Sequence, residues 1–371
     1  MTTENRFLYM KILRRYTLGE FAGQSAFGLA IFTFILLLDQ IFQIVNMVVS
    51  KGVPLKSALF IFTLMLPNVL SLSIPVAVLF GAIIAYGRLS SDGEIAAVKT
   101  AGISHGTFML PPVAAGFLMA LILLYYNLEI SPLTYAKFSQ TYFNLAVKMP
   151  ALRLEKKSIT EIGSNKIYFE NKKGNVLERV SIYKFDEATY EPAALIYASS
   201  ASVSVIPDDN KILFRLYNGS LQRVNIKNFE ETTALKFDNY NITIPFNISA
   251  SYSRSMREYT AGELLCEIKQ LESSGLKANL FKTELNLRIA VGAAPFFFVF
   301  VGVPLGLLSR KGARAAGFAM TMAVIFIYYI FLAVGINLSD KGTIPSEIAL
   351  QLPNLAALAA GIYLWRAEFK R

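Results

Sequence analysis

Six long stretches of apolar residues are the feature of this sequence that most restricts its fold. Each stretch carries almost no charge and is close to or longer than the roughly 20 residues that a helix needs to cross a bilayer. Such stretches are too long for the core helices of a globular protein, so each predicts a membrane span. The expected spans are Phe21 to Val49, Ser57 to Gly87, Gly106 to Leu128, Ile289 to Ser309, Ala315 to Ser339 and Ile348 to Trp365.

The composition excludes the common soluble classes. Of the 371 residues, 54% are hydrophobic and 17% are charged, whereas a soluble domain has roughly 25% charged residues. The net charge of +10 does not indicate nucleic-acid binding, because the basic residues lie mostly beside the apolar stretches. Cys266 is the only cysteine and His105 the only histidine, so we expect no disulfide, no metal site and no bound cofactor.

Basic residues in the short loops predict the orientation in the membrane. Twelve lie on one side, whereas the short loops on the other side hold only Lys51, Lys56 and Lys341. Because basic loops stay in the cytoplasm, we expect both termini there. The long segment from Glu129 to about Glu284 then lies outside.

This long segment is expected to fold separately, mostly as β structure. Its strand candidates, such as Ser200 to Val205, alternate apolar and polar positions. Asn218-Gly219 lies between Leu213 to Tyr217 and Ser220 to Val224, and it predicts a two-residue hairpin turn. About seven short strands indicate a sandwich or a jelly roll. An amphipathic helix with a capping box at Thr260 to Glu263 is expected to follow.

These elements divide the chain into four expected parts. The fold class is an α-helical membrane protein of six spans with an inserted all-β jelly-roll domain. The parts are an N-terminal transmembrane half (1–130), the β domain (131–258), a connecting helical segment (259–284) and a C-terminal transmembrane half (285–371).

A polar stripe interrupts the first span. Asp39 is the only formal charge inside that stretch, and a carboxylate near the bilayer centre costs about 2.5 to 3.5 kcal/mol on insertion scales. Gln43 and Asn46 follow four and seven residues later, so the three side chains share one face of the helix. The stripe either faces a substrate cavity or forms hydrogen bonds with a neighbouring helix.

The connection after the second span carries the signals of a short helix outside the membrane. Ser91 and Glu94 fit a capping box, and Gly102 supplies a stop. Ile95 and Val98, three residues apart, give the helix an apolar edge. This edge either docks into a groove of another protein or caps the bundle.

Two local sequences make the chain similar to a known family. They are Tyr86-Gly-Arg-Leu-Ser-Ser-Asp-Gly-Glu-Ile with the following Ala101-Gly-Ile-Ser104, and Glu284-Leu-Asn-Leu-Arg288 at the entry to the fourth span. With them, the chain resembles the LptF/LptG family, the permeases of the lipopolysaccharide-export ABC transporter of Gram-negative bacteria. The resemblance covers nearly the whole chain, and the second match leans towards the LptF branch.

The resemblance implies a non-catalytic, multi-pass subunit of the bacterial inner membrane, with a periplasmic jelly roll. Family members pair as two paralogous permeases over a dimeric cytoplasmic ATPase. They extract lipopolysaccharide from the outer leaflet and pass it to periplasmic jelly-roll bridge proteins of the LptC and LptA type. The sequence has no G-x-x-x-x-G-K-[ST] phosphate loop, so ATP hydrolysis is expected from the separate ATPase.

The resemblance also implies roles for particular residues. Segment 88–104 corresponds to the coupling helix, with Glu94 at the acidic position that contacts a basic residue of the ATPase. The polar stripe corresponds to the cavity surface, where relatives commonly carry basic residues that bind lipid A phosphates. Here the stripe carries a carboxylate and two amides instead. Cations elsewhere near the outer interface are therefore better electrostatic candidates for binding the phosphates. The expected sites are ATPase coupling by Arg88, Asp92, Glu94, Ile95 and Val98, the substrate cavity at Asp39, Gln43, Asn46, Lys51, Lys56 and Arg288, and the jelly-roll interior at Val203, Val205, Ile212, Phe214 and Leu216.

Two other functions fit the same span pattern. A membrane-tethered sensor or scaffold would use the β domain to bind a periplasmic protein, and an ion-coupled transporter would use Asp39. Simple core packing is an alternative role for each apolar residue of the β domain. Co-purification of an ATPase and lipopolysaccharide favours the exporter, whereas proton-dependent uptake without an ATPase favours the ion-coupled transporter.

Overall fold

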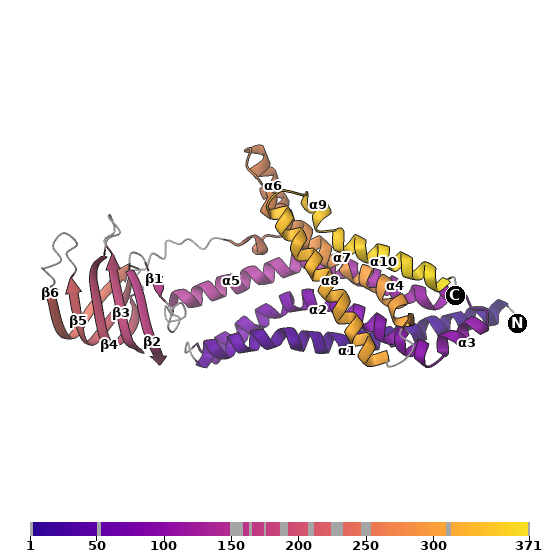
Figure 1. Cartoon of the computed structure of the whole chain (residues 1–371), viewed down its shortest axis with the longest axis horizontal. Coiled ribbons are helices and arrows are strands. Elements are labelled where there is room, and N and C mark those ends of the chain that lie inside the picture. The colour runs from indigo at the N-terminus through magenta and orange to yellow at the C-terminus, as the bar shows by residue number, and fades with distance from the viewer. Residues whose placement is uncertain are drawn as a thin grey trace. The chain divides into compact units, whose positions relative to one another are not determined.

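The computed structural model describes residues 3–49, 53–148, 159–162, 165–173, 176–185, 192–206, 211–223, 233–245, 254–308 and 313–369. They form two compact units (Figure 1). One unit, the helical bundle, comprises Met1–Asp39, Met65–Ala136 and Arg254–Arg371, and the other comprises Gln40–Leu64 and Lys137–Ser253, which include the β sheet.

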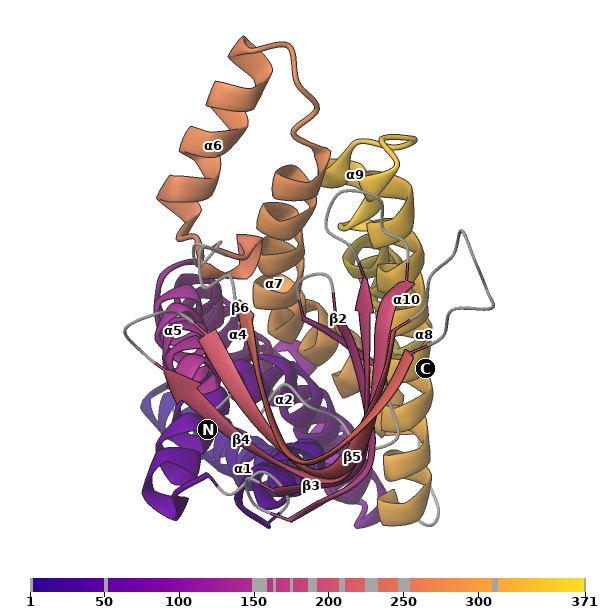
Figure 2. The ribbon, with the colours of Figure 1, turned by 90° about the vertical axis from the view of Figure 1, so that its left-hand side faces the viewer.

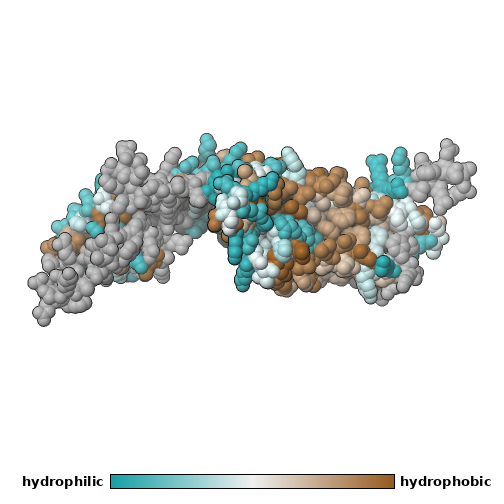
Figure 3. Space-filling view, turned by 90° about the horizontal axis from the view of Figure 1, so that it is seen from above, coloured by the Kyte–Doolittle hydropathy of each residue, from teal (hydrophilic) through white to brown (hydrophobic). Residues whose placement is uncertain are grey.

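Six of the described helices are long and apolar enough to cross a membrane, as the sequence predicts. On the face seen in Figure 3, hydrophobic side chains cover the middle of the bundle and hydrophilic ones lie towards its ends. The helices that form most of these six spans are α1 (Thr3–Val49), α2 (Leu55–Ser91), α4 (His105–Tyr125), α7 (Asn279–Leu308), α8 (Ala313–Asp340) and α10 (Leu352–Phe369). The short helical elements between them are α3 (Glu94–Thr100), η3 (Met256–Glu258), α6 (Ala261–Ser273) and α9 (Ser346–Ala349).

Two ends of the bundle can be named from these short helices. Figure 1 shows α3 at one end and α6 at the other. The first and last helices both have their chain ends at the α3 end. We call these the α3 end and the α6 end of the bundle.

Helices α2 and α7 pack closely at the centre of the bundle. A Cβ atom added at Gly302 would lie 2.9 Å from the Cβ of Ala82, and one added at Gly306 would lie 2.6 Å from the carbonyl oxygen of Ile83. Small residues spaced four apart let two helix backbones approach in this way. The pair Gly302 and Gly306 therefore serves packing between spans.

The third span is longer than the sequence predicts. Instead of ending at Leu128, α4 continues through a π-helical turn, η1 (Tyr126–Ile130), into α5 (Ser131–Lys148). The buried Asn127 of this turn accepts a 2.6 Å hydrogen bond from the hydroxyl of Ser71 in α2. A π turn holds one extra residue and often occurs at functional sites. Its position depends on contacts with α2, which a local sequence pattern does not reveal.

The inserted β domain is confirmed, and its described strands form one antiparallel sheet. The strands follow one another in the order of the chain, as in a meander, rather than alternating between two sheets. Their bounds are β1 (Thr160–Ile162), β2 (Asn165–Lys173), β3 (Val176–Phe185), β4 (Pro192–Ile206), β5 (Lys211–Arg223) and β6 (Thr233–Pro245).

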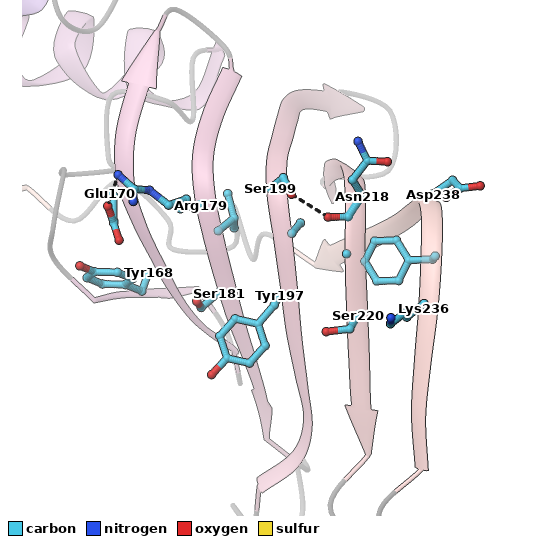
Figure 4. A pocket seen from close by; sticks show the side chains of 14 residues that line it. Tyr168, Glu170, Arg179, Ser181, Tyr197, Ser199, Asn218, Ser220, Lys236 and Asp238 are labelled. Carbon is cyan, nitrogen blue, oxygen red and sulfur yellow. Dashed lines mark hydrogen bonds and ion pairs between the residues drawn. The ribbon is translucent and has the colours of Figure 1, made fainter.

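The predicted hairpin at Asn218-Gly219 is wrong, because both residues lie inside β5. Asn218 has a φ of 49° and Arg179 in β3 has a φ of 54°, so the left-handed conformation bends a strand here instead of joining two. Figure 4 shows Arg179 and Asn218 in one row of residues that crosses the sheet. At this row the pairing between each two neighbouring strands from β2 to β6 skips one position. The row consists of Glu170, Arg179, Ser199, Asn218 and Asp238.

The bend folds the sheet into a trough with a shared core (Figure 2). Buried residues on one face of a strand normally lie two positions apart. Across the row they lie three positions apart, as between Leu177 and Val180 and between Ala198 and Ala201. This shift keeps apolar side chains on the inner face along both limbs of each strand. Fourteen buried residues from β2 to β6 form the resulting cluster, including Phe169, Ile182, Ile196 and Ile244.

Candidate functional site

The segment expected to couple to an ATPase consists of a turn and a short helix. Helix α2 runs through Ser91, and α3 begins at Glu94 after an N-cap at Gly93 with a φ of 76°. The predicted capping box is wrong, because the Ser91 hydroxyl donates to the carbonyl oxygen of Arg88 at 2.9 Å instead. A left-handed Gly93 lets the chain turn directly from one helix into the next. Gly102, with a φ of 70°, follows the end of the helix as predicted.

The apolar edge of α3 packs against the bundle. Ile95 is 8% exposed and belongs to a cluster with Leu89 and Phe108, and Val98 packs against the same cluster. The groove-docking interpretation of this edge therefore does not fit, because the chain itself covers Ile95. A partner can reach the polar residues of the segment, since Asp92 is exposed and Glu94 is half-buried.

Arg88 is the centre of a charged cluster at the α3 end. Its Nε donates to Glu20 at 2.8 Å, and its Nη2 donates to the hydroxyl of Tyr16 at 2.9 Å. Its Nη1 lies 3.2 Å from Asp92 and 3.5 Å from Glu94. The Tyr16 hydroxyl in turn donates to Glu94 at 3.0 Å. We call Tyr16, Glu20, Arg88, Asp92 and Glu94 the Arg88 cluster.

The Arg88 cluster joins three helices through side chains. Tyr16 and Glu20 belong to α1, Arg88 to α2 and Glu94 to α3. A further ion pair of 2.9 Å joins Lys99 of α3 to Glu368 of α10. A single exposed ion pair contributes little to stability. A guanidinium that donates to several acceptors at once, however, fixes the positions of these acceptors relative to one another. Sequence reasoning missed Tyr16 and Glu20, which lie about 70 residues away from Arg88 in the chain and carry no local signal.

The polar stripe lies on the open face of α1. Asp39, Gln43 and Asn46 are exposed, whereas the adjacent Ile44 and Met47 are 8% and 7% exposed. This alternation places the three polar groups on one face, as their spacing predicts.

The two predicted lysines of the substrate cavity have different outcomes. Lys56 is exposed in the first turn of α2. Lys51 lies outside the described residues.

Arg288 is buried, and all three of its side-chain nitrogens donate hydrogen bonds. Its side chain is 9% exposed and its Nε donates to Glu284 at 2.9 Å. Its two terminal nitrogens donate to the carbonyl oxygens of Tyr259 and Met256, at 2.7 and 3.2 Å. Arg288 therefore clamps the turn that precedes α6 onto α7, and its guanidinium is not open to a lipid phosphate as the electrostatic argument expects.

Four of the five predicted interior residues of the β domain lie in the trough. Val203, Ile212, Phe214 and Leu216 are at most 5% exposed and belong to the shared core. Val205 pairs with Ile212 in the register of β4 and β5, and its side chain lies outside the described part of the structure. Core packing accounts for the burial of the four described side chains.

The chain matches one protein family over almost its whole length. The family, described as the lipopolysaccharide export system permease LptF/LptG, matches residues 15–367. The chain belongs to the LptF/LptG family. The match covers LptF and LptG together, so the LptF branch stays a prediction.

One curated relative of this LptF/LptG family member was also found. It is the uncharacterized protein RP871 of Rickettsia prowazekii (strain Madrid E), which is 22% identical over 216 residues. The aligned part is 58% of this chain and 58% of the relative, so the comparison spans little more than half of either protein. The relative's name states no function, and the role of this chain is inferred from its family and its own residues.

Proposed function

We propose that this chain is a non-catalytic permease subunit of an ATP-driven lipopolysaccharide exporter in the inner membrane. The observation that carries the proposal is the α3 segment, whose acidic residues belong to a cluster that joins α1, α2 and α3. Family membership and six candidate spans support the same role. In this proposal both termini are cytoplasmic and the β domain lies in the periplasm.

Movement of the ATPase reaches the spans through the Arg88 cluster. A basic residue of a dimeric cytoplasmic ATPase binds Glu94, whose side chain is 34% exposed beside Arg88. Displacement of α3 then acts on α1 through Tyr16 and on α10 through Lys99. ATP hydrolysis on the separate subunit thereby closes the substrate cavity between this chain and a paralogous permease.

The open face of α1 lines that cavity. The stripe of Asp39, Gln43 and Asn46 offers carboxylate and amide groups rather than cations. Lys56 is the exposed cation among the described candidates, and it contacts substrate phosphates in this proposal.

The trough-shaped sheet receives the lipid from the cavity. Burial of an acyl chain is worth about 0.8 kcal/mol per CH₂, so release of a twelve-carbon chain into water costs roughly 10 kcal/mol. A β domain with an apolar inner face, joined to bridge proteins of the LptC and LptA type, avoids this cost. The inner face of β4 and β5 supplies such a surface when the limbs of the sheet separate.

The test is a charge reversal at Glu94. We expect Glu94→Lys to abolish co-purification of the ATPase and lipopolysaccharide transport, because the variant repels a basic partner residue, while membrane insertion is unchanged. The matched control is Asp340→Lys, which makes the same charge change at an exposed residue at the end of α8. Normal ATPase binding and transport by Glu94→Lys would contradict the proposed coupling role.

A further inference from the structure

A polar pocket lies near the α6 end of the bundle and is not accounted for by the proposed export role. It has a volume of about 320 Å³ and is formed by α2, η1, α5, η3, α7 and α8. Its polar lining includes Asn68, Ser71, Tyr135, Arg257 and Glu284. The pocket thus lies where the chain leaves the bundle through α5 and returns to it through η3.

Three guanidinium groups surround the returning turn, and two of them hold it in place. Arg254 donates to both carboxylate oxygens of Glu263, at 3.0 and 2.9 Å, and its guanidinium lies 4.4 Å from the ring centroid of Tyr259. Arg288 binds Glu284 and two backbone carbonyls, as described above. Their hydrogen-bonding groups are therefore occupied by the chain.

Arg257 differs from both of these residues. It is exposed, it lines the pocket, and within the described part of the chain it forms no ion pair. The charged lining consists of Arg257, Arg288 and Glu284, so the pocket carries an excess of one positive charge. An unpaired guanidinium in a concave site with hydroxyl and amide groups is suited to an anion with several acceptor oxygens, such as a phosphate.

The depth of the pocket indicates where this phosphate comes from. Ser71 precedes Arg88 by 17 residues in α2, which at 1.5 Å per residue places it about 25 Å from the Arg88 cluster. Arg288 precedes the last residue of α7 by 20 residues, or about 30 Å. Because the hydrocarbon core of a bilayer is about 30 Å thick, the pocket lies at the boundary opposite the α3 end, where lipid phosphates lie.

The apolar part of the lining matches a lipid rather than a free ion. Leu72, Val291, Leu332 and Ile336 come from three different spans and share the pocket with the polar residues. The volume is at the lower end of the range for ligand pockets, roughly 300 to 1,000 Å³, so it suits one small headgroup and the glycerol attached to it.

We propose that this pocket binds the phosphodiester group of a membrane glycerophospholipid, with Arg257 as the cation that contacts the phosphate. The lipid is a resident ligand and not the exported substrate, because the pocket is built within one chain and is small. Its place between the outgoing and returning segments lets the lipid brace both connections to the β domain.

Native mass spectrometry of the full-length protein, purified from membranes in mild detergent, tests the proposal. We expect wild type to retain a phospholipid and Arg257→Gln to retain about tenfold less, because a charge-assisted hydrogen bond is lost. Arg257→Lys should keep part of the occupancy. The control Arg366→Gln, at an exposed arginine in the last turn of α10, should bind lipid as wild type does.

Competition identifies the source of the phosphate. Dihexanoyl phosphatidylglycerol should displace the retained lipid, whereas the same concentration of inorganic phosphate should not. Equal lipid retention in wild type and Arg257→Gln would overturn the site, and equal displacement by inorganic phosphate would overturn the lipid assignment. Retention of lipopolysaccharide in place of phospholipid would also overturn it. These measurements need no ATPase, so their failure is distinguishable from failure of the export role.

Discussion

Helices α1 and α2 are almost equally apolar but lie in different surroundings. The most apolar part of α2 has a mean hydropathy of 2.3 and is 78% buried, whereas that of α1 has a mean hydropathy of 2.0 and is 17% buried. The same division separates α7, 67% buried, from α8, 22% buried. Hydropathy therefore predicts that a helix can span the membrane, but it does not predict whether the rest of the chain encloses that helix.

The open helices leave large apolar side chains mostly exposed. Phe34 and Phe42 of α1 are 60% and 72% exposed, and Phe326 of α8 is 69% exposed. The two helices meet each other through Phe32 and Phe318, whose rings stack at 6.3 Å. Since lipid tails are as apolar as these side chains, their exposure costs little in a bilayer. This surface is free for lipid or for the second permease of the proposed complex.

The largest expected effect on stability comes from adding a side chain at Gly81 of α2, and Gly23 of α1 is the matched comparison. A Cβ atom added at Gly81 of α2 would lie 2.7 Å from the backbone nitrogen of Ser25, whereas one added at Gly23 of α1 meets nothing within 4 Å. We expect Gly81→Leu to destabilise the isolated chain by about 3 kcal/mol or more through overpacking. Gly23→Leu should change the free energy of unfolding by less than about 1 kcal/mol. Thermal unfolding in detergent measures both, and equal effects would break the comparison.

A medium effect is expected where the open helix α1 is attached at the α3 end. Tyr16→Phe removes the hydroxyl that accepts from Arg88 and donates to Glu94. We expect a loss of about 1 kcal/mol and, in the assembled exporter, less transport for each ATP hydrolysed with ATPase binding retained. Tyr363→Phe, at a residue of α10 that is 73% exposed, is the control and should match wild type. Unchanged coupling in Tyr16→Phe would show that α1 receives no force through this contact.

The smallest effect concerns an exposed ion pair outside the spans. Arg254, together with the Thr260 amide, lowers the pKa of Glu263 from its usual value to about 2. Because the pKa is lower in the folded protein, the stabilisation is complete above about pH 4.5 and is lost as the pH falls towards 2. Glu263 is 42% exposed, so solvent screening limits the gain to about 1 kcal/mol or less. Glu263→Gln should unfold earlier than wild type at pH 7, and the difference should disappear as the pH falls below about 2; a difference independent of pH would contradict this.

The parts of the fold that local chemistry determines could be predicted from the sequence. The spans follow from apolar length, and the capping box at Thr260 and Glu263 forms as expected because both partners lie in one turn. Asn218-Gly219 misled the prediction, since the preference of Asn for positive φ suits a bend as well as a hairpin. Only the register with neighbouring strands distinguishes the two.

The parts of the candidate sites that depend on distant contacts could not be predicted. The motif around Arg88 predicts its role, but its partners Tyr16 and Glu20 come from another helix. The sequence predicts an Arg288 that is available for charge attraction, but its guanidinium binds the carbonyls of Tyr259 and Met256, about 30 residues earlier. Contacts of this kind arise from packing and leave no periodic pattern in the chain.

The packing of α4 against α7 has a consequence for how this architecture diversifies. A Cβ added at Gly116 of α4 would touch Val299 of α7, and one added at Gly292 of α7 would touch Leu124 of α4, so the segments before and after the β insertion interlock directly. These contacts lie within the helical unit and involve none of the strands. We therefore expect the inserted sheet to tolerate sequence change more readily than α4 and α7, because contacts between these helices do not pass through the sheet.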